Sequence, residues 1–221
     1  MAAKDVSTCK PSGNCCQSSN TANEDGWCIV RQDDYHDEMI TIKLKDGKTW
    51  YRPTSLAEVR KLLEVNSESY MLVGGNSSKG AYPIKEYPNC LIDVNHLTEL
   101  KVNELDQNCI IGAGWPMTEF MNILKARATE PDFSYFLKLY AHIELVAHIP
   151  LRNVCTIAGN LMIKHTYNLY QSDLYLIFDT VGAQLNIMDQ HGNFELVTMP
   201  NFLKLNMKGK IIVSVLFPPL T

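Results

Sequence analysis

Two short segments rich in small residues could bind a phosphate group. The first runs from Val73 to Gly80, reads V-G-G-N-S-S-K-G, and directly follows the apolar residues Tyr70-Met71-Leu72. Backbone that carries few side chains can turn several N–H groups toward one anion. The segment therefore predicts a phosphate-binding loop at the end of a strand. A tight solvent-facing turn that needs glycine for its positive φ is the open alternative.

The second segment is Thr156-Ile157-Ala158-Gly159-Asn160, and Ser172-Asp173 follow it a short way along the chain. Small residues here again allow close backbone approach to a ligand. In the first segment, the Asn76 amide and the Ser77 hydroxyl can add hydrogen-bond donors. Lys79 brings a positive charge. Its side chain either reaches a phosphate or points into water, and the second alternative is favoured.

Taken together, the two segments resemble the flavin domain of the molybdenum-containing hydroxylases, the aldehyde oxidase and xanthine dehydrogenase family. The FAD loops of that family read roughly V-G-N-T-x-x-G and S-[IV]-G-G-N, followed by S-D-L. The resemblance extends from about Trp50 to Pro219. Tyr51 to Leu56 is similar to the opening of that domain, and Arg152 to His165 is similar to its second loop in the aldehyde oxidase branch.

The resemblance implies an α+β fold, the PCMH-type FAD-binding domain made of two mixed α/β lobes, without the family's C-terminal flavoprotein lobe. The domain is expected over 39–221, with lobe one at about 48–112 and lobe two at about 113–221. Residues 1–38 are expected to be a flexible linker rich in Cys, Ser and Asn. The implied cofactor is FAD. The implied cofactor-binding residues are Leu72, Val73, Gly74, Gly75, Asn76, Ser77, Ser78, Lys79, Gly80, Thr156, Gly159, Asn160 and Asp173.

Three positions in the segments that carry the resemblance need comment. Ser77 stands where the family usually has threonine, and it keeps the hydroxyl. Ala158 replaces a glycine that is common in the family, which adds a methyl group at an expected point of close contact. Asp173 resembles the family aspartate near the hydroxyl-bearing chain of the cofactor; the alternative is a helix-end residue beside Ser172.

Full-length members of the family pass electrons from a molybdenum cofactor through two iron–sulfur clusters to FAD, and then to oxygen or a nicotinamide; they are typically homodimers. The resemblance therefore implies the FAD-binding module of an oxidoreductase, with iron–sulfur and molybdenum domains or subunits as partners. By itself the chain is not expected to oxidise a substrate. A truncated, non-catalytic remnant that acts as an interaction module without flavin is the alternative.

The sequence stops at Thr221, where the family continues into the lobe that completes the FAD pocket. We therefore expect a fragment, a separate flavin subunit or a degenerate descendant. A nicotinamide-binding Rossmann domain is disfavoured, because no G-x-G-x-x-G opens a helix after the first strand.

The composition of the chain excludes some classes of binding partner. The chain has 221 residues, 46 % of them hydrophobic, and a net charge of −4, so neither nucleic acid nor an anionic membrane is expected to bind. No run approaches eighteen apolar residues, and no apolar segment follows the N-terminus. We therefore expect a cytoplasmic protein.

No metal site is expected. Seven cysteines are present, and in the cytosol they should be reduced thiols. Cys9, Cys15, Cys16 and Cys28 crowd the N-terminus, but their spacing fits neither zinc sites nor ferredoxin clusters. No pair of histidines has ligand spacing. His148 and Arg152 flank the second segment, where contact with the cofactor is the less favoured alternative to ordinary helix-end positions.

Hydrophobic periodicity predicts a mixed fold. Ser55 and Glu58 form a capping box, Pro116 should be the first residue of a helix, and Gly182 should end one. Strands are expected at 40–44, 50–51, 70–73, 90–94, 109–112, 184–188, 194–197 and 211–217, and helices at 55–65, 117–126, 132–148 and 173–181. The strand 211–217 is expected to lack packing neighbours and to offer a docking surface.

Overall fold

The computed structural model describes residues 38–66 and 69–220. The expected linker falls outside the described residues except for residue 38, and so do Cys9, Cys15, Cys16 and Cys28. None of the described helices has the length and apolar character needed to cross a membrane.

A four-stranded sheet carries the first small-residue segment. Its strands, in spatial order, are β1 (Ile40–Lys43), β2 (Thr49–Arg52), β4 (Cys90–Asp93) and β3 (Tyr70–Val73). β1 and β2 pair antiparallel, whereas β2, β4 and β3 run parallel. Parallel strands need a crossover, which α1 (Leu56–Val65) provides between β2 and β3. The predicted cap is confirmed, because the Ser55 side chain accepts a hydrogen bond from the Glu58 N–H.

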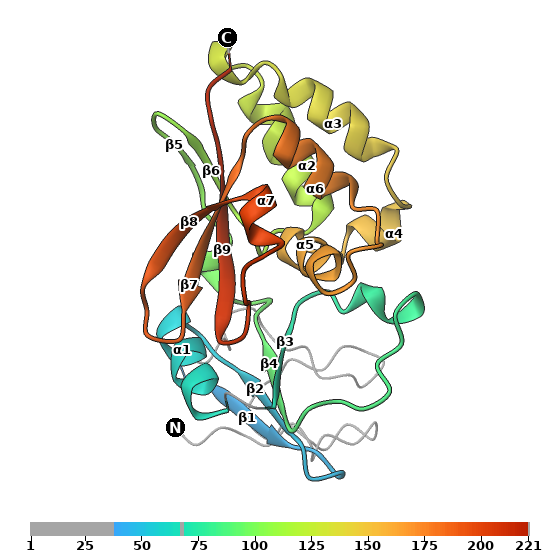
Figure 1. Cartoon of the computed structure of the whole chain (residues 1–221), viewed down its shortest axis with the longest axis vertical. Helices are drawn as coiled ribbons and strands as arrows, with labels where there is room; N and C mark the ends of the chain where they lie inside the picture. Colours follow the sequence, from blue (N-terminus) through green and yellow to red (C-terminus); the bar gives the residue numbers. More distant parts are fainter. Residues whose placement is uncertain (1–37, 67–68, 221) are drawn as a thin grey trace, which may run out of the picture. The chain divides into compact units, whose positions relative to one another are not determined.

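A five-stranded antiparallel sheet forms the larger part of the fold (Figure 1). Its strands, in spatial order, are β5 (Asn103–Leu105), β6 (Cys109–Gly112), β9 (Lys210–Phe217), β7 (Gln184–Asp189) and β8 (Phe194–Thr198). The sequence analysis predicted all of these strands except β5. The strand 109–112, expected in lobe one, pairs here with β9; the lobe boundary near 112 stays a prediction.

The expectation that the strand 211–217 is exposed was wrong. β9 lies between β6 and β7, so both of its edges are hydrogen-bonded. Its side chains are buried on both faces, with Val215 and Phe217 fully inaccessible. A strand placed in this way offers no docking surface.

Helices cover one face of the five-stranded sheet (Figure 1). They are α2 (Met117–Arg127), α3 (Phe136–Glu144), α4 (Ile149–Arg152), α5 (Ile157–Thr166), α6 (Asp173–Thr180) and α7 (Met199–Phe202). The rings of Phe120 and Phe178 pack edge-to-face at 5.7 Å, and both contact Phe217 of β9. These aromatic contacts form the centre of the larger core.

Two helix predictions needed correction. The single helix expected at 132–148 is shorter, because α3 covers only Phe136–Glu144 and Ala147 has a left-handed φ of 56°, which a continuous helix cannot include. The Arg152 guanidinium donates to the carbonyl of Glu144, the last residue of α3, and to those of Val146 and Ala147 in the turn that follows. Pro116 has an extended ψ of 153° and is the N-cap residue of α2 rather than its first helical residue.

A second core joins the two sheets. Leu56, Val59, Leu62 and Leu63 of α1 belong to one buried cluster with Ile92 of β4 and with Met188, Ile211 and Val213 of the five-stranded sheet. The apolar face of α1 is thus shared between the two sheets.

Candidate functional site

The first small-residue segment lies at the carboxyl end of β3. After Val73, Gly74 and Gly75 lead into a short 3₁₀ turn, η3 (Ser77–Gly80), which Asn76 opens with a left-handed φ of 48°. The Asn95 side-chain amide donates to the Gly74 carbonyl over 3.2 Å and holds the start of the turn.

Several backbone donors of this loop remain available. Within residues 38–66 and 69–220, no hydrogen bond uses the backbone N–H groups of Gly75, Asn76, Ser77 or Ser78. Successive unpaired N–H groups in a turn form an anion-binding concavity. The loop can therefore hold a phosphate through backbone dipoles.

The second segment is the start of a helix, which the sequence analysis missed. Thr156 is the N-cap of α5, and its hydroxyl accepts a hydrogen bond from the Gly159 N–H over 3.1 Å. The N–H groups of Ile157 and Ala158 donate to the carbonyls of Trp115 and Ala113. All three backbone donors of the first turn are therefore used within the protein, and this helix end has none left for an anion.

Glycine is required where the two segments meet. A Cβ at Gly75 would lie 1.6 Å from the carbonyl oxygen of Val154, and one at Gly74 would lie 3.1 Å from the Thr156 hydroxyl oxygen. Close packing between the two segments is thus a reason for these glycines that is separate from ligand binding.

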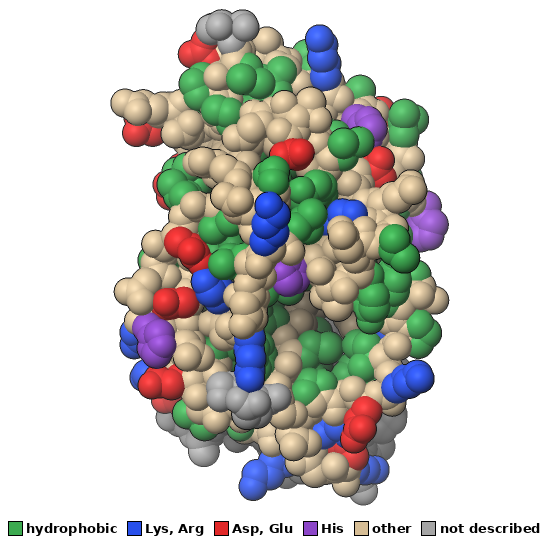
Figure 2. Space-filling view, in the orientation of Figure 1, with side chains coloured by type: hydrophobic (Ala, Val, Ile, Leu, Met, Phe, Trp, Pro, Cys, Tyr) green, Lys and Arg blue, Asp and Glu red, His purple; other side chains and the backbone are tan. Residues whose placement is uncertain are grey.

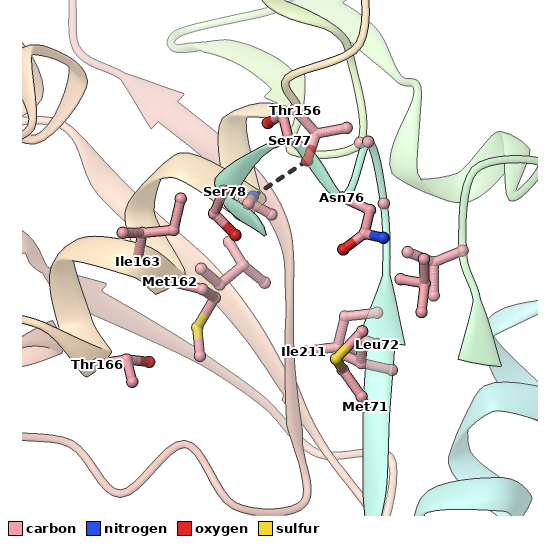
Figure 3. Close-up of a pocket in the computed structure, with 18 of the residues that line it drawn as sticks. Met71, Leu72, Asn76, Ser77, Ser78, Thr156, Met162, Ile163, Thr166 and Ile211 are labelled. Carbon is pink, nitrogen blue, oxygen red and sulfur yellow. Dashed lines mark hydrogen bonds between the residues drawn. The ribbon is translucent and has the colours of Figure 1, made fainter. Parts of the chain in front are cut away.

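A cavity of about 430 Å³ lies between β3 and α5 and is lined by both segments. In Figure 3, Asn76, Ser77, Ser78 and Thr156 gather at one end, while Met162 and Ile163 of α5 face Met71, Leu72 and Ile211. Figure 2 shows the hollow with hydrophobic side chains at its walls. A polar end with an apolar flank is typical of small-molecule sites.

Nine of the thirteen predicted binding residues line this cavity. They are Leu72, Val73, Gly74, Gly75, Asn76, Ser77, Ser78, Thr156 and Gly159. Among the described lining residues, Lys79, Gly80, Asn160 and Asp173 do not appear.

Gly80 has no side chain, and the side chains of the other three residues have other partners. The Lys79 ammonium lies 5.2 Å from the centre of the Tyr87 ring. The buried Asn160 amide donates to the Tyr170 hydroxyl and accepts from the Ser172 hydroxyl. The Asp173 carboxylate lies 3.2 Å from Nε2 of His142. The binding roles of these residues stay predictions.

The flanking residues His148 and Arg152 are used locally. His148 caps α4, with its Nδ1 accepting from the Leu151 N–H, and Arg152 holds the end of α3 as described above. Both arrangements agree with the helix-end reading that the sequence favoured.

Several lining residues were not predicted from sequence. Met162, Ile163, Thr166 and Tyr167 come from α5 and its end, and Tyr82 and Ile84 come from the segment after η3. Gly159, Met162, Ile163 and Thr166 recur at helical spacing. This spacing would have predicted the lining residues of α5 if Thr156 had been recognised as an N-cap.

The site has few charges. Lys210 is a lining residue, and its ammonium pairs with the Glu195 carboxylate. Burial raises the pKa of the Cys155 thiol beside Thr156, although hydrogen bonds with Ser77 and Asn160 oppose that shift. Over the described ranges, no three His, Cys, Asp or Glu side chains are placed to hold a metal ion.

The described fold and site define an α+β module of two sheets, with a cavity between β3 and α5. A family model described as "FAD binding domain in molybdopterin dehydrogenase" matches residues 42–220. The chain therefore belongs to this family of FAD-binding domains, whose cofactor is FAD.

Curated relatives include aldehyde oxidases from Arabidopsis thaliana. Indole-3-acetaldehyde oxidase is 32 % identical over 164 residues, which cover 70 % of this chain and 12 % of the relative. Abscisic-aldehyde oxidase is 29 % identical over 161 residues, which cover 71 % and 12 %. The match thus spans about an eighth of the length of these relatives.

Solved structures share the fold. Carbon monoxide dehydrogenase from Hydrogenophaga pseudoflava has a TM-score of 0.63 at 19 % identity, covering 82 % of this chain and 61 % of that chain. Quinoline 2-oxidoreductase from Pseudomonas putida 86 has a TM-score of 0.56 at 24 % identity, covering 76 % and 57 %.

Proposed function

We propose that this chain binds FAD in the cavity between β3 and α5, with the pyrophosphate at the backbone N–H groups of Gly75 to Ser78. The observation that supports this most directly is the combination of unpaired loop donors and an apolar flank in one cavity. A dinucleotide flavin needs both features, because its phosphates are charged and its rings are largely apolar.

The residues present fit such a ligand. Backbone dipoles can stabilise a pyrophosphate without burying an unpaired lysine, and hydroxyl and amide groups of Ser77, Ser78 and Asn76 add donors at the same end. Met71, Leu72, Met162, Ile163 and Ile211 then remove apolar ligand surface from water. Bound flavin would supply the redox chemistry, and this chain would bind, orient and shield it.

We further propose that the chain serves as the flavin module of an oxidoreductase related to the aldehyde oxidases, receiving electrons from iron–sulfur clusters and passing them to a final acceptor. Iron–sulfur and molybdenum domains or subunits are the proposed partners, and the chain alone is not expected to oxidise substrate. The proposed location is the cytoplasm; free buried thiols at Cys90, Cys109 and Cys155 support it.

Titration of the full 221-residue chain with FAD, followed by flavin fluorescence, tests the proposal. The double substitution Asn76→Gly and Ser78→Ala removes two polar side chains while keeping the left-handed backbone that glycine tolerates. It should weaken binding. The matched control is Glu86→Ala, further along the same segment, because Glu86 is exposed and is not a lining residue; binding should be unchanged.

Absence of FAD binding by the parent chain would overturn the proposal and favour the remnant without flavin. Equal affinities of the parent and the double variant would show that the Asn76 and Ser78 side chains add nothing to binding and that the loop acts through its backbone N–H groups alone.

A further inference from the structure

Three tyrosines form a cluster beside the cavity. The rings of Tyr82 and Tyr167 are stacked, with centroids 4.3 Å apart and planes 19° from parallel. Tyr170 meets Tyr82 edge-on, with centroids 6.0 Å apart and planes at 89°. Tyr82 and Tyr167 line the cavity. We call these three residues the tyrosine cluster.

The cluster connects the two segments that form the polar end of the site. Tyr82 follows η3, and its N–H donates to the Ser78 carbonyl over 2.8 Å. Tyr167 is the C-cap of α5, and its N–H donates to the Ile163 carbonyl. One ring comes from just after the first segment and the other from the end of the helix that the second segment begins. Both rings reach the same part of the cavity wall.

Hydrogen bonds hold the cluster from behind. The Asn160 amide donates to the Tyr170 hydroxyl over 3.1 Å, and the Ser172 hydroxyl donates to the Asn160 carbonyl oxygen over 2.6 Å. Ser172 in turn caps α6 by accepting from the Tyr175 N–H. Tyr170 is thereby fixed to two helices, and its ring fixes the orientation of Tyr82.

The rest of the apolar wall differs in kind. Met71, Leu72, Met162, Ile163 and Ile211 are aliphatic or thioether side chains. They give dispersion contacts but no flat π surface. Tyr82 and Tyr167 add that surface, and flat heteroaromatic rings stack on tyrosine at low cost in side-chain entropy.

We propose that Tyr82 and Tyr167 form the ring-stacking part of this site, against which one planar heteroaromatic ring of the dinucleotide packs. Asn160 and Tyr170 act as positioning residues that hold Tyr82 in place. This inference rests on the proposed function. Adenine and isoalloxazine share the required chemistry, and the experiment distinguishes them.

The test uses the full chain and equilibrium binding of FAD, measured by flavin fluorescence. Tyr82→Ala and Tyr167→Ala should each weaken FAD about tenfold, within the range measured when a stacking aromatic is removed. Tyr82→Phe keeps the ring and should retain the parent affinity. Tyr87→Ala is the matched control, since Tyr87 is on the same segment but is not a lining residue.

Two partial ligands identify the ring. If adenine stacks on the cluster, Tyr82→Ala weakens ADP-ribose and leaves FMN unchanged. If isoalloxazine stacks, the same substitution weakens FMN, and the fluorescence of bound flavin rises because a tyrosine quencher has been removed. Either pattern supports the ring-stacking role.

The outcomes separate this inference from the proposed function. A parent chain that binds no FAD overturns both. The ring-stacking role alone is overturned if Tyr82→Ala and Tyr167→Ala bind FAD as tightly as the parent chain does. Circular dichroism verifies that both variants are folded.

Discussion

Gly75 lies so close to Val154 that a Cβ on the glycine would be 1.6 Å from the valine carbonyl oxygen. The contact joins the loop after β3 to the turn that precedes α5. A glycine in a phosphate-binding loop is usually explained by the ligand, but this one is already required by the packing of the protein on itself.

Gly75→Ala should therefore destabilise the fold whether or not FAD is present. Relief of the overlap requires the two segments to separate, and overpacking of this kind costs about 1–3 kcal/mol. Urea denaturation without cofactor measures the effect. Gly80→Ala is the control and should stay near the parent, because its Cβ meets nothing within 4 Å. Equal stability of the two variants would contradict the packing explanation.

Thr156→Ala should destabilise α5 by about 1 kcal/mol, the usual cost of losing an N-cap side chain. The Thr156 hydroxyl accepts from the Gly159 N–H, and alanine leaves that donor without a partner. Thermal denaturation followed by circular dichroism would measure the loss. Thr156→Ser keeps the hydroxyl and should recover most of the stability; a serine variant as unstable as the alanine variant would argue against capping.

Asn160→Ala should also be destabilising, by about 1–3 kcal/mol, because it leaves buried polar groups without partners. Asn160 is 5 % exposed and connects the hydroxyls of Tyr170 and Ser172. The double variant with Tyr170→Phe removes one of those orphaned hydroxyls. In a double-mutant cycle from denaturation curves, the two changes should be less than additive; strict additivity would show that the bond contributes little.

Three buried thiols should make stability depend on alkaline pH. Burial raises the pKa of Cys90 and of Cys109 from the ordinary 9.0 to about 11, and raises that of Cys155 as well. Between these values the unfolded chain loses the protons while the folded chain keeps them. The free energy of unfolding should therefore be fully retained below about pH 9 and should fall as the pH rises toward 11.

Urea denaturation at about pH 8 and about pH 10 measures this fall. The matched variant carries Cys90→Ala and Cys109→Ala; it should be less stable than the parent at the lower pH, with the gap narrowing at the higher pH. A gap that stays constant would mean that these thiols do not titrate differently on unfolding.

Local signals in the sequence were sufficient for much of the fold. The apolar residues before Gly74 predicted β3 and the loop after it, and Ser55 with Glu58 predicted the start of α1. Recognition of the family and of FAD as its cofactor was confirmed by the family model.

Other features depend on contacts between distant residues. The apolar stripe Phe136, Tyr140, Ile143 and Ala147 continues past the true end of α3, so its period could not reveal the left-handed backbone at Ala147. The approach of Gly75 to Val154 exists only once both segments are folded. The continuous apolar run in β9 indicated burial on both faces. The order of the strands in the sheet, however, cannot be predicted from any local sequence pattern.

That strand order has a consequence for how the domain is made. β5 and β6 form one hairpin and β7 and β8 another, and β9 is the strand that connects them in the sheet. During synthesis the two hairpins cannot become one sheet until residues 210–217 have left the ribosome. β9, the partner of β6, is synthesised about a hundred residues after it. Pairing the two strands closes a long loop, which slows folding. Until that moment the apolar edges of both hairpins are open to chaperones and to other nascent chains.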